Sequence, residues 1–281
     1  MTPDIVIPVR PNPKDDQLRY TLRAIHAHVP DLAERRIVIA GGLPAYIPTA
    51  TVTHLATVQD SDPWTNVGRN LTTALDHIDQ DWLWWWQDDI YPLKPVAHIP
   101  LYARHGTIGS YTAALTRTNA WKAHSYLKQY VTGVLAQQAI LIEWGFDPDE
   151  TPNGCCHTPT PIHVPTLQDI LDRLTDECPS HALGHFKALY AAVMWRNGTP
   201  VQHIVDPKII RPDRAITNMA WVSTSGPSWK GSAGQTIRTM FPDPSPYEIP
   251  PPAAAPRQQV NHRTRRQPRT PRQKHPLRWQ A

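Results

Sequence analysis

Two adjacent carboxylates, Asp88 and Asp89, directly follow the apolar stretch WLWWW at 82–86. That stretch is typical of a buried strand, and in an open α/β sheet ligands bind outside the carboxyl ends of the strands. Neighbouring carboxylates repel each other and are costly to desolvate, and a divalent cation relieves both problems. Mg²⁺ and Mn²⁺ prefer such oxygen ligands and also hold phosphate oxygens. The pair therefore predicts a metal and phosphate site, the alternative being a solvated turn after a strand.

A second group of polar side chains, Asn66, Arg69 and Asn70, precedes that strand. Spacings of three and four residues place side chains on one face of a helix, so these three are expected together. Amides and a guanidinium hydrogen-bond a nucleotide base, a ribose or a diphosphate, and arginine does so with two donors at once. The alternative is the solvent-facing side of an amphipathic helix.

Four short apolar runs predict the strands that position these groups, at residues 4–9, 36–40, 52–58 and 82–86. Apolar side chains at helical spacing predict helices in the connections, one of them with Asp62 as N-cap and Pro63 as the first helical residue. The alternation of strand and helix predicts an α/β fold, with a mostly parallel, Rossmann-type central sheet covered by helices.

The second half of the chain has a weaker pattern. Helices are expected over 128–144, 166–174 and 185–197. Thr166 and Asp169 form the capping box that is expected to begin the middle one. The last of the three is expected to be amphipathic, and residues 147–165, with five prolines, are expected to form a loop.

The basic charge of the chain is concentrated at its end. Residues 250–281 contain eight Lys or Arg residues, no Asp or Glu, and no hydrophobic periodicity, which predicts a disordered, proline- and arginine-rich tail. Residues 1–249, expected to form one domain, have 20 basic and 24 acidic side chains, a net charge of −4. Nucleic-acid binding is therefore expected only non-specifically and only through the tail.

No apolar run is long enough to span a membrane, and the start MTPDIVIPVR lacks the charged and apolar regions of a signal peptide. The three cysteines include the adjacent pair Cys155 and Cys156, and they form neither a disulfide framework nor a zinc-binding spacing. We therefore expect a cytoplasmic protein in which this pair is structural.

The order of the parts resembles the nucleotide-binding half of GT-A fold glycosyltransferases: a first strand DIVIPVR, a helix with N-x-x-R-N, and a strand that ends in an acidic pair. The resemblance covers residues 4–95 and divides the domain into a nucleotide-sugar half, 1–95, and an acceptor half, 96–249. Where the family has a DxD motif the chain has Gln87-Asp88-Asp89, so Gln87 stands at the first acidic position.

The resemblance implies a glycosyltransferase that moves a sugar from a nucleotide diphosphate sugar to an acceptor hydroxyl, assisted by Mn²⁺ or Mg²⁺. Binding of the nucleotide sugar is implied for Pro8, Arg10, Asp60, Trp64, Asn66, Arg69, Asn70 and Asp88. The metal is expected on Asp88 and Asp89, with His185 or His157 as a further ligand from the second half. Trp64 is the preferred stacking residue, ahead of Trp221 and Trp229.

An inverting enzyme also needs a base for the acceptor hydroxyl. Catalytic carboxylates are expected among Asp89, Asp147 and Asp213, with Asp149 and Glu150 as further candidates for the base. Lys187 and Lys208 are candidate partners of the phosphates, although solvated lysines are the ordinary alternative.

The second half is similar to phage-encoded and capsule-type transferases of this fold in the segments 156–164, 185–193 and 241–248. This implies a glycan or protein acceptor, such as a phage virion protein, and action in a host cytoplasm. Two alternatives stay open. A sugar nucleotidyltransferase is one, although the first loop VRPNPKDD has no glycine to cradle phosphates. The other is a non-catalytic binding protein whose basic tail binds a polyanion.

Overall fold

The computed structural model describes residues 2–10, 16–123, 125–174, 183–216 and 218–249. Residues 1–249 form one compact unit. The disordered tail predicted for 250–281 lies outside the described residues. None of the described helices combines the length and the hydropathy that a membrane-spanning segment requires.

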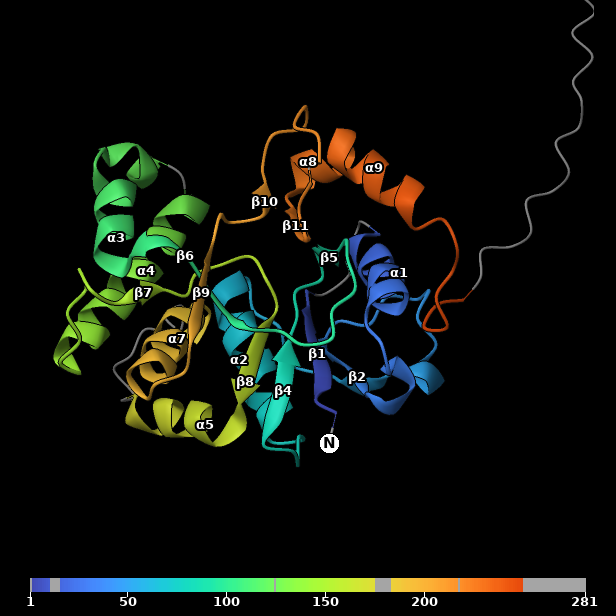
Figure 1. Ribbon diagram of the computed structural model, residues 1–281, viewed down its shortest axis with the longest axis horizontal. Coiled ribbons are helices and arrows are strands. Elements are labelled where there is room, and N and C mark those ends of the chain that lie inside the picture. Colours follow the sequence, from blue (N-terminus) through green and yellow to red (C-terminus); the bar gives the residue numbers. More distant parts are fainter. Residues whose placement is uncertain (1, 11–15, 124, 175–182, 217, 250–281) are drawn as a thin grey trace, which may run out of the picture. The chain divides into compact units, whose positions relative to one another are not determined.

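A five-stranded sheet, in the order β3-β2-β1-β4-β8, forms the core of this unit (Figure 1). Its strands are β1 (Asp4–Val9), β2 (Ile37–Gly41), β3 (Thr53–Leu55), β4 (Trp82–Trp85) and β8 (Thr160–His163). The first four run parallel, and β8 pairs antiparallel with β4. The order β3-β2-β1-β4 is that of a Rossmann-type sheet. The predicted fold class, α/β with a mostly parallel central sheet, is therefore confirmed.

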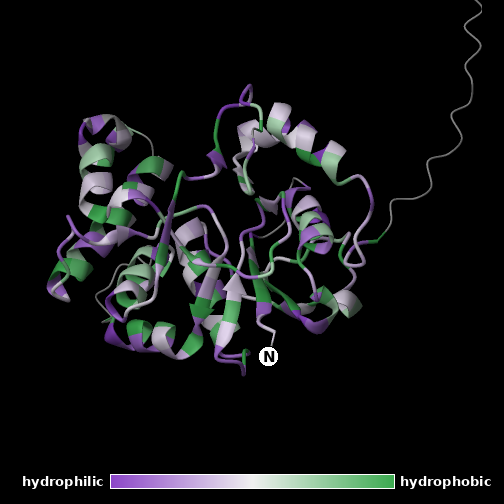
Figure 2. Ribbon diagram, in the orientation of Figure 1, coloured by the Kyte–Doolittle hydropathy of each residue, from purple (hydrophilic) through white to green (hydrophobic). Residues whose placement is uncertain are grey.

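Two helices, α1 (Gln17–His28) and α2 (Pro63–Leu75), cover opposite faces of the sheet. Side chains alternate between the faces of a strand, so Ile5 and Ile7 pack on the α1 side and Val6 packs on the α2 side. Because both faces are covered, the strands need no polar side, and β1 after Asp4 and β2 consist mainly of apolar residues (Figure 2).

Helix α2 begins where the sequence predicts. The Asp62 carboxylate accepts hydrogen bonds from the backbone N–H groups of Trp64 and Thr65 at 3.3 and 3.0 Å, and Pro63 is the first helical residue. Such a cap contributes about 1 kcal/mol. Farther along this helix, Asn66 and Asn70 are buried.

The described residues also form two smaller sheets. One has the order β10-β11-β5, from Lys208–Ile209, Trp221–Thr224 and Ile90–Pro92; the other has the order β7-β6-β9, from Pro152–Asn153, Leu101–Thr107 and Val201–Ile204. The remaining helices are α3 (Ile108–Thr116), α4 (Ser125–Glu143), α5 (Val164–Arg173), α7 (Lys187–Arg196), α8 (Gly226–Lys230) and α9 (Ser232–Met240), with 3-10 turns η1 (Leu32–Glu34), η2 (Thr49–Thr51) and η3 (Asn119–Ala123).

Three expectations for the second half are corrected. The proline-rich segment 147–165 is not a plain loop, because it contains β7 and β8. Helix α5 begins at Val164 with His163 at the N-cap and a proline in its first turn, so Thr166 does not cap it. Helix α7 is buried nearly all round and is therefore not amphipathic, because it lies in the core between α5, β7 and α4.

A buried ion pair ties the end of the domain to α1. Arg23 donates to both oxygens of Glu248, at 2.7 and 2.9 Å, and Arg19 approaches one of them at 3.1 Å. The Glu248 side chain is fully buried. Arg23 also donates to the carbonyl oxygens of Phe241 and Pro242, at 3.1 and 2.7 Å, which holds the chain after α9 against the domain.

Candidate functional site

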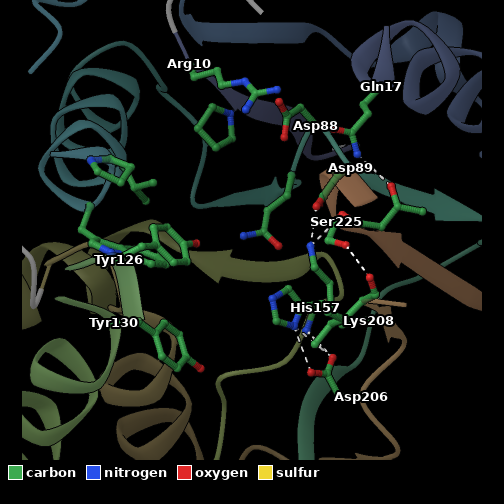
Figure 3. Close-up of a pocket in the computed structure, with 18 of the residues that line it drawn as sticks. Arg10, Gln17, Asp88, Asp89, Tyr126, Tyr130, His157, Asp206, Lys208 and Ser225 are labelled. Atoms are coloured by element: carbon green, nitrogen blue, oxygen red, sulfur yellow. Dashed lines mark hydrogen bonds and ion pairs between the residues drawn. The ribbon is translucent and has the colours of Figure 1, made fainter. Parts of the chain in front are cut away.

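A cleft of about 900 Å³ opens at the carboxyl ends of β1 and β4. The ends of these strands contribute Pro8, Val9 and Arg10 and the run Gln87–Asp89. The opposite wall comes from the second half of the chain (Figure 3). That wall includes Arg104, Tyr111, Tyr126, Tyr130, His157, Val205, Asp206, Lys208, Ile210, Arg214 and Ser225. The position of the cleft is the one that the parallel sheet predicts for a ligand.

Asp89 is held by an ion pair with Lys208. The Lys208 ammonium lies 2.5 Å from Oδ2 of Asp89, and the Ser223 hydroxyl donates to Oδ1 at 3.2 Å. The small sheet explains this contact. Ser223 of β11 is paired with Ile90, the residue after Asp89, on one side and with Lys208 of β10 on the other. The register of two neighbouring strands therefore delivers Lys208 to the acidic pair.

The two neighbouring carboxylates face different cations. Figure 3 shows the Asp88 carboxyl group beside the guanidinium of Arg10, whereas Asp89 points toward Lys208. The backbone carbonyl of Asp88 accepts a hydrogen bond from Thr21 of α1 at 2.7 Å, which fixes the turn between them. The mutual repulsion that suggested a metal ion is thus relieved by side chains of the protein.

The residues expected to bind the metal do not fit a resident divalent ion. Among the described residues, no group of three or more His, Cys, Asp or Glu side chains is placed to hold one. Asp89 is engaged by Lys208, and His157 is engaged by Asp206. The expectation that His185 is a metal ligand is corrected. His185 is only 6% exposed, packs against the Trp64 ring at 4.0 Å between centroids, and is not part of the cleft wall.

His157 and Asp206 form a second charged cluster in the cleft. Nδ1 of His157 lies 2.9 Å from Oδ2 of Asp206, and the Arg104 guanidinium lies 3.3 Å from the same oxygen. The backbone N–H of His157 donates to Asp206 Oδ1 at 3.0 Å. Burial opposes ionisation of Asp206, but the hydrogen bonds and charge of His157 and the charge of Arg104 outweigh it and lower its pKa to about 2. Asp206 is therefore ionised and orients the imidazole.

Lys187, the first residue of α7, holds the loop that carries His157. Its buried ammonium donates to the carbonyl oxygens of Thr158 at 2.8 Å and Cys156 at 3.2 Å, and burial lowers its pKa to about 8. Lys187 therefore stabilises the loop and does not line the cleft, contrary to its expected role as a phosphate partner. Burial raises the pKa of Cys155 to about 11 and that of Cys156 to about 12, which suits structural thiols.

The polar face predicted on α2 divides in two. Asn66 and Asn70 are buried and line the cleft. The Asn66 amide accepts a hydrogen bond from the backbone N–H of Asp60 at 2.6 Å and donates one to its carbonyl oxygen at 2.8 Å. The Asn70 amide oxygen accepts a hydrogen bond from the Thr57 hydroxyl at 2.6 Å. These amides hold the loop after β3. The expectation that Arg69 shares the face of these two residues is corrected. Arg69 is exposed and lies outside the cleft wall. Its guanidinium is 3.8 Å from the carboxylate of Asp60, which is also exposed and also lies outside the wall.

An aromatic wall lies on the side of α3 and α4. Trp64 lines the cleft, and its ring packs against Tyr126 and Tyr130 at 5.8 and 5.7 Å between centroids. Tyr126 is 61% exposed and therefore offers an open ring face. Trp221 and Trp229 are core residues, so neither is available for stacking on a ligand.

The carboxylates expected as the catalytic base do not reach the cleft. Asp147, Asp149, Glu150 and Asp213 are all absent from its walls. The first three lie in one turn, where the Asp147 carboxylate accepts a hydrogen bond from the backbone N–H of Asp149 at 2.8 Å.

The carboxylate that does line the cleft, Asp206, was not predicted from the sequence. Its signal was the segment Asp206-Pro207-Lys208, in which two charged residues follow a short strand.

No protein-family model and no curated protein sequence matches the chain. Among solved structures, it is similar to the galactosyltransferase LgtC in complex with donor and acceptor sugar analogues, with a TM-score of 0.46 and 11% identity over 88% of this chain and 97% of that one. It is also similar to a glycosyltransferase involved in the glycosylation of the major capsid of PBCV-1, with a TM-score of 0.25 and 13% identity over 51% and 76% of the two chains.

Proposed function

We propose that this protein is a glycosyltransferase that moves a sugar from a nucleotide diphosphate sugar to a hydroxyl of a glycan or protein acceptor. One observation carries the proposal. The residues that follow β1, the cleft-facing side of α2 and the run Gln87-Asp88-Asp89 line a single cleft at the carboxyl ends of parallel strands. These are the parts that the GT-A resemblance matches, and they meet where such a sheet binds its ligand.

The donor occupies the side of the cleft formed by β1 and β4. Pro8 and Arg10 contact the nucleoside, and Asp88 accepts hydrogen bonds from the ribose hydroxyls. The diphosphate lies toward Lys208, which is the cation paired with the acidic run. Arg10 and Asp88 lie together at this end in Figure 3, and Lys208 lies on the opposite wall.

The acceptor is activated by His157. When Nδ1 donates to Asp206, the Nε2 atom carries the lone pair and can take a proton. As the acceptor oxygen attacks the anomeric carbon, its proton passes to Nε2, and the bond from that carbon to the diphosphate oxygen breaks. Asp206 stabilises the imidazolium that forms, as the carboxylate does in other histidine bases.

The aromatic wall suits the sugars. The exposed ring of Tyr126, which packs against Trp64, lies beside the polar groups of the cleft, and flat aromatic faces pack against the apolar face of a pyranose. The exposed Val205 and Ile210 add apolar surface to the cleft wall, on the side where we place the acceptor. The sequence resemblance suggests that the acceptor is a glycan or a side chain of a virion protein.

Binding of the donor tests the proposal directly. Thermal unfolding is followed with UDP-, GDP- and dTDP-sugars, in buffer with EDTA and in buffer with Mn²⁺. A ligand at about 100 times its Kd stabilises the native state by about 2.7 kcal/mol, which is a clear rise in Tm. One nucleotide class should give that rise and should also be hydrolysed or transferred when sugar release is measured.

The matched variants are Asp88→Asn in the cleft and Asp243→Asn, an exposed carboxylate outside it. Asp88→Asn should weaken the Tm rise, whereas Asp243→Asn should leave it unchanged. A well-folded protein that responds to no nucleotide sugar in either buffer would contradict the proposed function.

A further inference from the structure

We propose that Lys208 supplies the positive charge that the leaving diphosphate needs, so that the protein transfers the sugar without a divalent cation. This inference rests on the proposed function and concerns the same site. It starts from a disagreement: the acidic run predicts a metal ion, yet the carboxylate best placed to bind it already holds the ammonium of Lys208, at 2.5 Å.

The ammonium is built into the fold. Its donors are directed to Asp89 Oδ2, to the Ser223 hydroxyl at 3.1 Å and to the Thr224 carbonyl at 2.8 Å. The Thr224 N–H in turn donates to the Asp89 carbonyl at 3.1 Å, so the strand that holds the lysine also holds the aspartate. Both side chains are 18% exposed, which leaves the pair largely desolvated but open to the cleft.

A divalent ion on Asp89 competes directly with this arrangement. It either displaces Lys208 from a partly buried ion pair or sits beside a second positive charge. Both changes are unfavourable, because charges interact more strongly where water is excluded. Asp88 does not restore the site, since its carboxyl group lies beside Arg10 in Figure 3. Among the described residues, no third carboxylate, histidine or thiol completes a metal site.

The chemistry balances with Lys208 in this role. When the bond between the anomeric carbon and the diphosphate breaks, its electron pair stays on the phosphate oxygen, and the leaving group gains one negative charge. Lys208 keeps its proton, turns one of its three donors from its protein partners to the phosphate oxygen, and stabilises that charge from the cleft wall. The proton of the acceptor hydroxyl goes to His157. Fixed cations aimed at developing charge are an alternative to metal ions in such steps.

The experiment uses the full chain, stripped of metal with EDTA, and the nucleotide sugar found by thermal unfolding. The rate of sugar transfer or hydrolysis should be within about twofold of the rate with added Mn²⁺, because the charge at the leaving group is already present. Lys208→Met should lower kcat by about 10²-fold, and Lys208→Arg should retain most of the activity. Added Mn²⁺ should restore part of the activity of Lys208→Met, since Asp89 is then free to bind it.

A second measurement does not depend on activity. Binding of Mn²⁺ is followed by the loss of the free-ion EPR signal, and the wild-type protein should bind little where Lys208→Met binds measurably. Wild-type activity that EDTA abolishes and Mn²⁺ restores would overturn the inference while leaving the proposed function intact. A protein that neither binds nor turns over any nucleotide sugar in either buffer would overturn the proposed function, and the inference with it.

Discussion

Nδ1 of His157 lies 2.9 Å from Oδ2 of Asp206, although the two residues are 49 positions apart in the chain. The Arg104 guanidinium shares that oxygen at 3.3 Å, and the backbone of His157 is bonded to the other one. His157 is therefore held through both its ring and its backbone N–H. This fixes the orientation of the imidazole, as a base requires before the acceptor arrives.

His157→Gln should lower kcat by about 10²- to 10⁴-fold, because the acceptor hydroxyl loses its base. The KM for the nucleotide sugar should change little, since His157 is proposed to act on the acceptor. Steady-state kinetics with the nucleotide sugar and the acceptor make the comparison. His98→Gln, an exposed histidine outside the cleft, is the control, and an equal loss of kcat there would refute the assignment.

Asp206 should make stability depend on pH in acid. Its pKa is lowered to about 2 in the folded protein, against an ordinary value of about 3.9. The unfolded chain therefore binds the proton first as the pH falls. The stabilisation, about 2 kcal/mol, is present above pH 4 and is lost as the pH falls toward 2. Urea unfolding of wild type and Asp206→Asn at pH 6, 4 and 3 should give a difference in free energy that shrinks with pH. A constant difference would contradict the ion cluster.

Tyr126→Ala should weaken binding of the sugar substrates. Its ring is 61% exposed on the cleft wall, and loss of one stacking face costs about 1 kcal/mol, which raises KM about fivefold. The Tm of the protein without ligand should stay nearly unchanged, because an exposed ring contributes little to the core. Trp195→Ala removes a partly exposed aromatic ring outside the cleft and should leave KM as it is.

Glu248→Gln should destabilise the domain by about 3–5 kcal/mol. The substitution leaves the buried Arg23 without its counter-charge, and an uncompensated buried charge is costly. Chemical denaturation measures the free energy of unfolding. Glu150→Gln, at an exposed carboxylate in a turn, should change it by less than about 0.5 kcal/mol. A loss of similar size in both variants would show that the pair does not stabilise the domain.

In the first third of the chain, short sequence patterns were sufficient to predict where β1 lies and where α2 begins. The strand β1 has the predicted bounds, and Asp62 caps α2 as its side chain and Pro63 predicted. Each of these features depends on neighbours a few residues away. The same reasoning failed for Arg69, because spacing says which residues share a helix face but small rotations decide which of them the sheet buries.

The strand β8 could not be predicted from its own residues. It is short, it contains Pro161, and Pro159 and Pro165 lie close to its two ends. Proline is tolerated there because, among the strands that the structure describes, β8 is the last of the sheet and pairs on one edge only. The same limit applies to the site. Lys208 and Asp89 are 119 positions apart, and their contact depends on the register of strands that pair only in the folded chain.

The pairing of β8 with β4 bears on how substrates enter. Four residues of a strand from the second half are paired with the strand that delivers the acidic run, from Trp82 with His163 to Trp85 with Thr160. A hinge between the two halves of the domain would have to break this ladder. We therefore expect movement around the cleft to occur in side chains and loops at its rim, while this ladder keeps β4 and β8 together.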